Sequence, residues 1–169
     1  MFYFTFMNSN YLSNEEALRK IKHFCVYQER CHSEVKAKLY SFGIYKKDAD
    51  AILAQLIEEN YLNEERFATQ YAGGRFRIKH WGRVKIKHEL KMKQVSVYNI
   101  KKALAAIDEK EYQKILAKLF DQKLLSLKSE KNIFIRKRKL QDHLMQKGFE
   151  INLITAMFTE SRLPAGRRG

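Results

Sequence analysis

The sequence predicts an all-α protein made of three tandem three-helix-bundle repeats, which form an elongated, curved array. Only 7 Gly and 1 Pro occur among the 169 residues, and so few helix breakers favour helices over a turn-rich β fold. Apolar residues recur at the three- and four-residue spacing of amphipathic helices and not in strict alternation. The same apolar pattern appears three times along the chain, which is typical of a repeat protein.

Capping residues and joints give approximate limits to the repeats. The first helix is expected to begin after Ser13, because Ser13 and Glu16 have the spacing of a capping box. A second helix is expected over residues 33–42 and ends at Gly43, since glycine adopts the left-handed conformation of a helix C-terminus at little cost. A third helix follows over residues 47–60. The expected organisation is an N-terminal extension (1–13), three repeats (14–61, 62–107 and 108–160) and a flexible C-terminal tail (161–169).

The second and third repeats show the same order of elements. In the second repeat a helix is expected over about residues 63–80, and Trp81-Gly82 separates it from a helix that carries Ile86 and Leu90. The joint Gln94-Val95-Ser96 precedes the last helix of this repeat. In the third repeat, helices are expected over about residues 109–127 and 132–147, and a final helix carries Ile154, Met157 and Phe158.

Six positions align across the three copies, at offsets of 51 and then 54 residues. Amphipathic helices always align to some extent, but each copy here also has a joint residue followed by an apolar residue. That recurrence favours a true repeat. The aligned positions are Val35, Leu39, Gly43, Ile44, Ala49 and Leu53 in the first copy; Ile86, Leu90, Gln94, Val95, Ile100 and Leu104 in the second; and Leu140, Leu144, Gly148, Phe149, Ile154 and Phe158 in the third.

The formal charge of +14 and the isoelectric point of about 9.8 favour a polyanionic partner, because Lys and Arg that neutralise phosphates release condensed counterions. The charge is unevenly distributed. Residues 75–102 hold ten Lys or Arg and one acid, and residues 128–147 hold seven Lys or Arg and two acids. Residues 48–65 hold six acids and no Lys or Arg, and this acidic segment could face a basic patch on a partner or another part of the chain.

The helix after Trp81-Gly82 is the most informative basic stretch. Arg83, Lys87 and Lys91 recur every four residues and are expected to form a positive stripe on it, although a solvated lysine-rich helix is the alternative. Trp81 could stack on a base, but a lone Trp at a joint is more typical of an anchor between helices. The residues expected to contact DNA phosphates or acidic residues of a partner are Arg75, Arg77, Lys79, Arg83, Lys87, Lys91, Arg136, Lys137, Arg138 and Lys139.

No pattern of catalytic or metal-binding residues emerges from the sequence. His23, Cys25, Cys31 and His32 lie close together, but the Cys-x5-Cys spacing is not typical of zinc sites. Gly-rich phosphate loops, HExxH and G-x-S-x-G motifs are absent. We expect no metal, no cofactor, no small-molecule substrate and no enzymatic activity. A membrane span is not expected either, and the two cysteines without a secretory context favour the cytoplasm.

The chain resembles the RecX family of recombination regulators over roughly residues 14–160. The matching segments are residues 34–39 with Gly43-Ile44, residues 61–67, residues 77–86 with Leu90, and, in the last copy, residues 138–140 with 147–149. The resemblance implies a protein that binds the RecA recombinase, lodges in the groove of the RecA–DNA filament, and restrains its ATPase and strand exchange. It also implies some affinity for single- or double-stranded DNA and no catalytic residues. Gln94, where the other copies have glycine, predicts a less tight turn.

Two other functions remain open at this point. One is a helix-turn-helix-like DNA-binding protein that acts without a recombinase, and a sequence-specific footprint would identify it. The other is a metal-dependent nuclease built on the acids of residues 48–65, although their placement at helix starts and outer faces fits helix-dipole and surface roles better.

Overall fold

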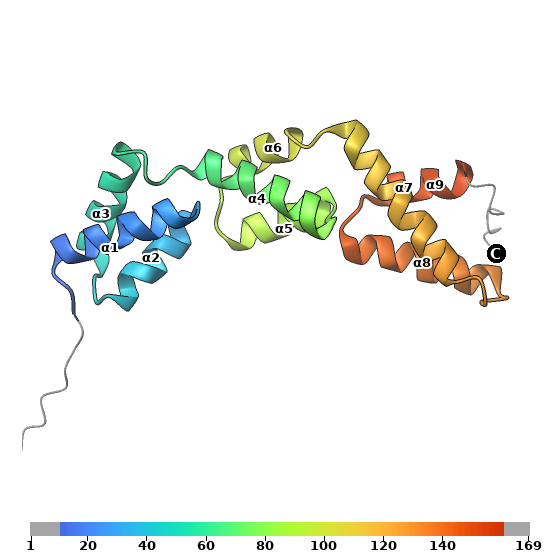
Figure 1. Ribbon diagram of the computed structural model, residues 1–169, viewed down its shortest axis with the longest axis horizontal. Helices are drawn as coiled ribbons and strands as arrows, with labels where there is room; N and C mark the ends of the chain where they lie inside the picture. The colour runs from blue at the N-terminus through green and yellow to red at the C-terminus, as the bar shows by residue number, and fades with distance from the viewer. Residues whose placement is uncertain (1–10, 161–169) are drawn as a thin grey trace, which may run out of the picture. The chain divides into compact units, whose positions relative to one another are not determined.

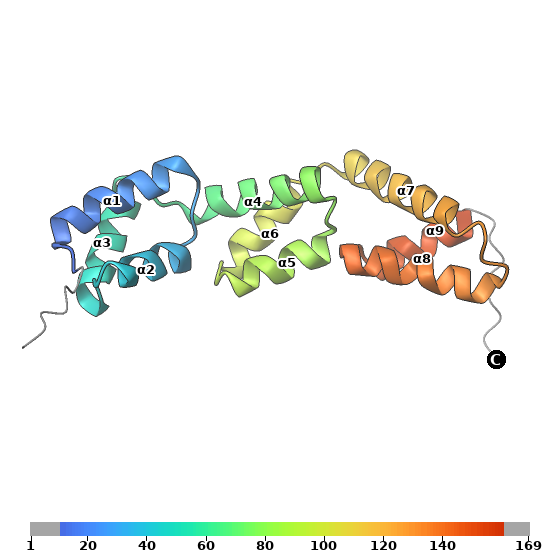
Figure 2. The ribbon, with the colours of Figure 1, turned by 60° about the horizontal axis from the view of Figure 1, so that its bottom comes forward.

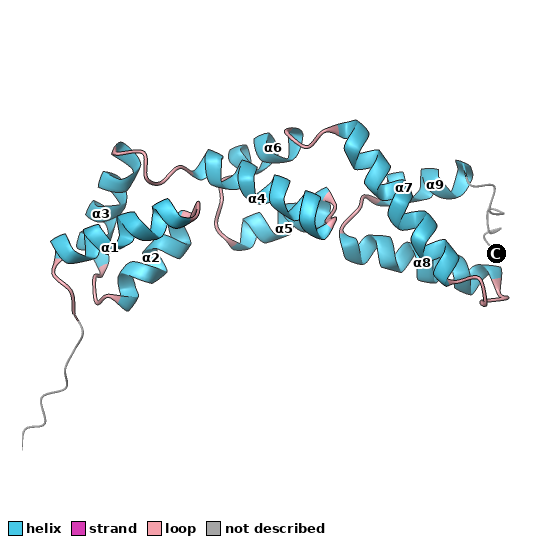
Figure 3. Ribbon diagram, in the orientation of Figure 1, coloured by secondary structure: helices cyan, strands magenta, loops and turns pink. Residues whose placement is uncertain are grey.

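The computed structural model describes residues 11–160, and within this range every regular element is an α-helix (Figures 1 and 3). The all-α prediction is confirmed. The helices form three groups of three: α1 (Asn14–Tyr27), α2 (His32–Ser41) and α3 (Lys46–Glu58); α4 (Glu64–Lys79), α5 (Arg83–Met92) and α6 (Val97–Ala105); and α7 (Glu109–Ser126), α8 (Ile133–Lys147) and α9 (Ile151–Glu160). Most of the expected N-terminal extension and the whole C-terminal tail lie outside the described residues.

The three helix groups belong to two compact units. The first unit extends to Phe67 and includes Lys93–Val95, and the second unit comprises Ala68–Met92 and the chain from Ser96 onward. The second unit therefore contains all of α7, α8 and α9 together with α5, α6 and most of α4. The sequence pattern distinguishes three repeats, whereas the contacts join the second and third repeats into one body.

The core of the first unit is formed by α1, α2 and α3. Ile21, Leu39 and Leu56, one from each helix, are fully buried. The expected capping box starts α1: the Glu16 backbone nitrogen donates to the Ser13 hydroxyl (3.2 Å), and the Ser13 nitrogen donates to the Glu16 carboxylate (3.1 Å). Burial of about 1.5–3 kcal/mol per large apolar side chain is the main force that holds the three short helices together.

The same left-handed turn ends the middle helix of each group. Gly43, Gln94 and Gly148 have φ angles of 81°, 61° and 91°. The expectation of a less tight turn at Gln94 is wrong, because this residue adopts the same left-handed conformation as its two glycine counterparts. A side chain in that conformation costs roughly 1–2 kcal/mol, which the burial of Val95 and Ile100 directly after the turn offsets.

An aromatic cluster forms the core of the second unit where its two helix groups meet. Tyr112 of α7 is fully buried. Its ring centroid lies 5.6 Å from that of Phe76 in α4 and 5.1 Å from that of Phe149, which follows α8. Large aromatic side chains from both groups thus share one buried cluster, which explains why the second unit is a single compact body.

Candidate nucleic-acid interface

Helices α5 and α8 of the second unit are joined end to end by backbone hydrogen bonds (Figures 1 and 2). The Gly82 nitrogen donates to the Lys147 carbonyl (2.9 Å), and the Val84 nitrogen donates to the Gly148 carbonyl (3.0 Å). The first amides of one helix and the last carbonyls of another lack partners within their own helices. At this junction each set satisfies the other, so α8 continues into α5 in space although 40 residues lie between the end of α5 and the start of α8 in the sequence.

A buried tyrosine completes the junction. The Arg83 backbone nitrogen donates to the Tyr112 hydroxyl (2.9 Å), and that hydroxyl donates to the Glu150 carboxylate (2.6 Å). Burial, followed by the hydrogen bond to Glu150, raises the pKa of Tyr112 well above its usual range. The hydroxyl therefore keeps its proton at all physiological pH values and serves as both acceptor and donor.

Arg83 is committed to the junction and not to the solvent-facing surface. Its guanidinium forms an ion pair with Glu109 (2.7 Å), lies 3.9 Å from the Glu150 carboxylate, and sits 4.0 Å from the centre of the Tyr112 ring. The sequence placed Arg83 on one stripe with Lys87 and Lys91. The structure separates them, because Arg83 lies in the first turn of α5, close to the carboxylates of Glu109 in α7 and Glu150 between α8 and α9.

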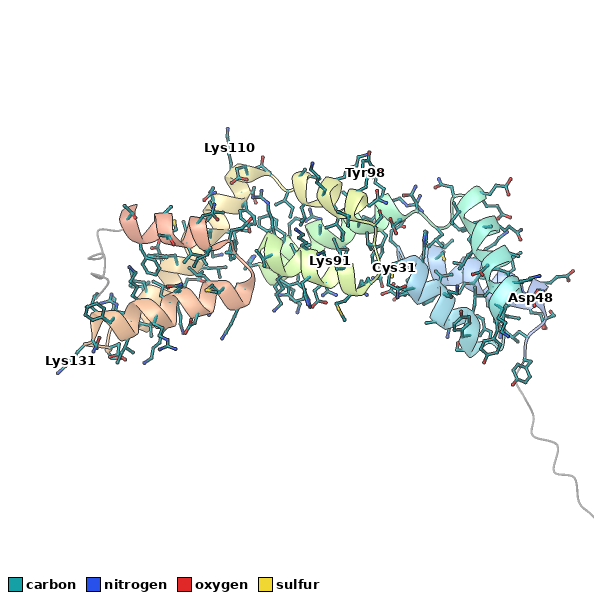
Figure 4. The ribbon with its side chains drawn as sticks, turned by 180° about the vertical axis from the view of Figure 1, so that it is seen from behind. Cys31, Asp48, Lys91, Tyr98, Lys110 and Lys131 are labelled. Carbon is teal, nitrogen blue, oxygen red and sulfur yellow. The ribbon has the colours of Figure 1, made fainter. Side chains whose placement is uncertain are left out.

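Lys87 and Lys91 are exposed on α5, and no acid within residues 11–160 pairs with either of them. Their four-residue spacing puts them on the same side of the helix. Figure 4 labels Lys91 in the last turn of α5. These two lysines are free to meet an anion.

The basic run at residues 136–139 divides into two pairs. Arg136 and Lys137 are half-buried, and the Lys137 ammonium lies 5.0 Å from the centre of the Phe158 ring in α9. Arg138 is the most exposed of the four, with 86% of its side chain accessible, and it contacts Asp142 only at 3.9 Å. Lys139 is exposed but forms a 2.8 Å ion pair with Glu130. Arg138 is therefore the basic side chain of α8 that is most available to a partner.

The basic residues at the end of α4 have different surroundings again. Arg75 packs over the rings of Tyr71 (4.8 Å) and Trp81 (5.3 Å), whereas Arg77 and Lys79 are exposed. Trp81 also receives the Lys85 ammonium 4.6 Å from its ring centre. Two cations of this chain therefore pack against the ring of Trp81. This arrangement fits an anchor between helices better than a surface on which a base could stack.

The junction places the two basic blocks of the sequence on two helices, α8 and α5, that follow one another end to end. At 1.5 Å per residue, the 25 residues of α8 and α5 extend over about 37 Å, which is close to the ~34 Å of one turn of B-DNA. Sequence reasoning found both basic blocks but missed Tyr112 and Glu150, whose hydrogen bonds contribute to the junction between the two helices. A tyrosine on an amphipathic helix and an acid after a joint carry no distinctive local signal.

The histidine and cysteine residues near the end of α1 do not form a metal site. Cys25 and Cys31 are both buried free thiols, and burial raises the pKa of Cys25 to about 11, which disfavours the thiolate that a metal needs. Across the described residues, no group of three or more His, Cys, Asp or Glu side chains is arranged to hold a metal ion. The same part of the chain contains no helix that is long and apolar enough to cross a membrane.

The acidic segment of residues 48–65 is partly neutralised within the first unit. Asp50 forms a 2.8 Å ion pair with Lys36 of α2, and Glu59 pairs with Lys22 of α1. These contacts give the segment a structural role in the first unit, and they leave the basic surface of α5 and α8 as the clearer candidate for a partner.

Comparisons with known proteins identify what the chain is similar to. A family profile described as "RecX, second three-helix domain" matches residues 63–104, which lie within the second repeat expected from the sequence. A relative named "Regulatory protein RecX" from Pelodictyon phaeoclathratiforme is 33% identical over 125 residues, covering 72% of this chain and 74% of the relative. A relative of the same name from Oceanobacillus iheyensis is 28% identical over 82% of this chain, which spans 50% of that relative's length.

Solved structures share the fold. The crystal structure of RecX from Lactobacillus salivarius matches with a TM-score of 0.79 at 22% identity, and the match covers 89% of this chain and 97% of that one. A second crystal structure, of a regulatory protein RecX, matches with a TM-score of 0.78 at 20% identity over 87% of this chain. These matches bear out the prediction of tandem three-helix repeats.

Proposed function

Since this chain belongs to the RecX family of regulatory proteins, we propose that it binds the RecA–DNA filament and restrains RecA ATP hydrolysis and strand exchange. It acts by binding and without catalysis. RecA enters as the partner because the family resemblance implies it. The surface of α8 and α5 supplies phosphate contacts to the DNA or meets acidic residues of the filament.

The end-to-end junction of α8 and α5 is the observation that carries this proposal. Separate basic helices could bind any anion weakly, but a continuous surface about 37 Å long is long enough to contact several phosphates of an extended polymer at once. On α8 and α5, the exposed cations without a close acidic partner are Lys87, Lys91 and Arg138. The nearest acid to Arg138 is Asp142, at 3.9 Å. Arg77 and Lys79, exposed at the end of α4, extend the basic surface beyond the junction.

Charge reversal tests the proposal directly. The triple variant K87E/K91E/R138E should lose most of its inhibition of RecA ATPase on single-stranded DNA. It should also reduce the dependence of filament binding on salt concentration, because each lost phosphate contact lowers the logarithmic slope by roughly 0.7–0.9. A titration of ATPase activity and binding between low and physiological salt measures both effects.

The matched control changes the net charge equally at other exposed lysines. Lys47 in α3 and Lys110 and Lys114 in α7 are exposed, so the variant K47E/K110E/K114E should retain inhibition apart from a small general loss of electrostatic attraction. If both variants lose inhibition equally, the effect depends on net charge alone and the proposed site is wrong. A sequence-specific footprint without recombinase would instead identify a DNA-binding protein of the helix-turn-helix kind.

A further inference from the structure

Apolar side chains are exposed in the last turn of α7 and the first turn of α8, and lysines are exposed in the turn that joins the two helices. Leu125, Phe134 and Ile135 are 56%, 63% and 44% accessible. Lys128 and Lys131 are exposed in the turn between the helices, and Arg138 lies one helical turn beyond Phe134. Figure 4 labels Lys131 at this end of the second unit. We call these six residues the hairpin tip. Phe134 and Ile135 are neighbours in the chain, and large exposed apolar side chains are typical of a binding surface.

The hairpin tip holds the backbone of its aromatic residue in a defined position. The Asn132 side-chain oxygen accepts hydrogen bonds from the backbone nitrogens of Phe134 (3.0 Å) and Ile135 (3.2 Å), so it caps α8. Phe134 therefore projects from the first, capped turn of a 15-residue helix and not from a loose loop. A ring presented from a rigid element loses little conformational entropy when it binds.

The one acid of the turn is neutralised within the tip. Glu130 forms a 2.8 Å ion pair with Lys139 and accepts a hydrogen bond from the Asn132 nitrogen (3.2 Å). The ion pair and then this backbone hydrogen bond hold the pKa of Glu130 below its usual range. Its negative charge is compensated locally, so the tip presents Lys128, Lys131 and Arg138 to an anion without repulsion from Glu130.

We propose that the hairpin tip binds single-stranded nucleic acid, with Phe134 stacked on an exposed base and Lys128 and Lys131 in contact with phosphates. This chemistry is favoured because an aromatic face beside cations suits unpaired bases on a charged backbone. In a duplex the base faces are already stacked, so inserting the ring would cost the unstacking of a base step. The core of a protein interface is usually depleted in lysine, which makes a protein pocket the weaker fit. The proposal deepens the proposed function, since the tip and the cations of α5 and α8 would contact one strand.

Three fluorescently labelled probes separate base contacts from phosphate contacts: a 20-nucleotide oligo(dT), a strand of the same length in which every base is absent, and a duplex. Fluorescence anisotropy gives the affinity of the full-length chain for each. The variant F134A should bind oligo(dT) roughly 5- to 100-fold more weakly and should bind the base-free strand as the wild type does. F134W should retain the affinity for oligo(dT), whereas F134L, which is apolar but not aromatic, should lose it.

The matched control is Tyr98, an aromatic residue of α6 that is 71% accessible and lies outside the tip (Figure 4). Y98A should bind all three probes as the wild type does. Equal binding of F134A and wild type to oligo(dT), equal losses on the base-free strand, or full retention by F134L would each overturn the stacking proposal. A loss of recombinase binding with unchanged oligo(dT) binding would also overturn it and would assign the tip to a protein partner.

One further variant distinguishes failure of this inference from failure of the proposed function. The double variant K87E/K91E removes charge from α5 and leaves the tip intact. If it binds every probe and the filament as the wild type does while F134A loses oligo(dT) binding, the α5 surface is refuted and the tip stands. If K87E/K91E weakens binding to all probes while F134A has no effect, the tip is refuted and the α5 surface stands.

Discussion

Gly82 lies against the backbone of Gly148, and neither glycine has room for a side chain. A β-carbon on Gly82 would overlap the carbonyl group of Gly148, and a β-carbon on Gly148 would overlap Lys85. This approach lets the Val84 nitrogen reach the Gly148 carbonyl at 3.0 Å. Gly148 also ends α8 in the left-handed conformation, with a φ angle of 91°. The two glycines thus determine whether α8 and α5 can be joined.

The variant G82A should therefore destabilise the second unit. Its new methyl group meets backbone atoms that cannot rotate away, so the junction must open or shift. The expected loss in the free energy of unfolding is about 2–4 kcal/mol from strain and lost hydrogen bonds. Urea unfolding of the full chain, followed by circular dichroism, measures it.

Gly74 provides the matched control in the neighbouring helix. A β-carbon at this position of α4 would meet no atom within 4 Å. G74A should leave the junction intact and stabilise α4 by roughly 0.5–1 kcal/mol, because alanine has the higher helix propensity. If G82A proves as harmless as G74A, the close contact between the two glycines does not constrain the junction.

Tyr112 should contribute to the same junction through its hydroxyl. Y112F keeps the buried ring but removes the acceptor for the Arg83 nitrogen and the donor to Glu150. Groups left without partners in a partly buried site cost about 1–3 kcal/mol. The same change at exposed Tyr98 should leave stability unaltered. A Y112F protein as stable as wild type in urea would show that water replaces the hydroxyl at no cost.

The repeat architecture could be predicted from the sequence because periodicity and joint residues are local signals. Ser13 with Glu16, and Gly43 with Ile44, mark helix ends directly, and the aligned apolar positions are buried or half-buried in all three copies. The union of the second and third repeats could not be predicted, since it depends on contacts such as Tyr112 with Phe149 that carry no sequence periodicity.

The candidate site was predicted only as a list of cations. Sequence spacing alone treats Arg83, Lys87 and Lys91 as equivalent, because all three fall on one helical stripe. Their difference arises from Glu109 and Glu150, which approach Arg83 from distant parts of the sequence. Tertiary contacts of this kind decide which cations are left without an acidic partner, and no local sequence pattern predicts them.

Arg83 and Lys87 should consequently respond differently to the same neutralisation. R83Q removes the guanidinium from its contacts with Glu109 and Tyr112, so it should lower the stability of the second unit. K87Q removes an exposed charge and should leave stability within about 0.5 kcal/mol of wild type, while it lowers the salt slope of filament binding by roughly 0.7–0.9. Unfolding curves and salt titrations of the two variants measure both properties. If R83Q keeps full stability but lowers the salt dependence of filament binding, Arg83 contacts the partner and does not act at the junction.

Gln94 occupies a position where glycine should be more favourable. Its φ angle of 61° lies in the left-handed region, as do those of its counterparts Gly43 and Gly148. Q94G should relieve the side-chain strain, although it adds some entropy to the unfolded chain. The expected net gain is about 0.5–1 kcal/mol in the free energy of unfolding, measured in urea. The opposite change, G43Q, should destabilise the corresponding turn in the first unit. A destabilised Q94G would show that the Gln94 side chain makes a contact worth more than the strain.

Glu34 should make the stability of the first unit depend on pH. Its carboxylate accepts a hydrogen bond from the Lys93 ammonium at 2.6 Å. Burial acts to raise its pKa, but the hydrogen bond and charge of Lys93 outweigh burial and lower the pKa from the ordinary value of 4.5. A carboxyl with a lowered pKa in the folded state contributes stability above its unfolded pKa and loses that contribution as the pH falls through the folded value.

The variant E34Q should therefore be less stable than wild type near neutral pH, and the difference should shrink as the pH falls below about 4.5. Urea unfolding at a series of pH values between 7 and 3 (roughly the range over which carboxylates titrate) measures the difference. A stability difference for E34Q that stays constant across the acid range would mean that the carboxylate acts through packing and not through its charge.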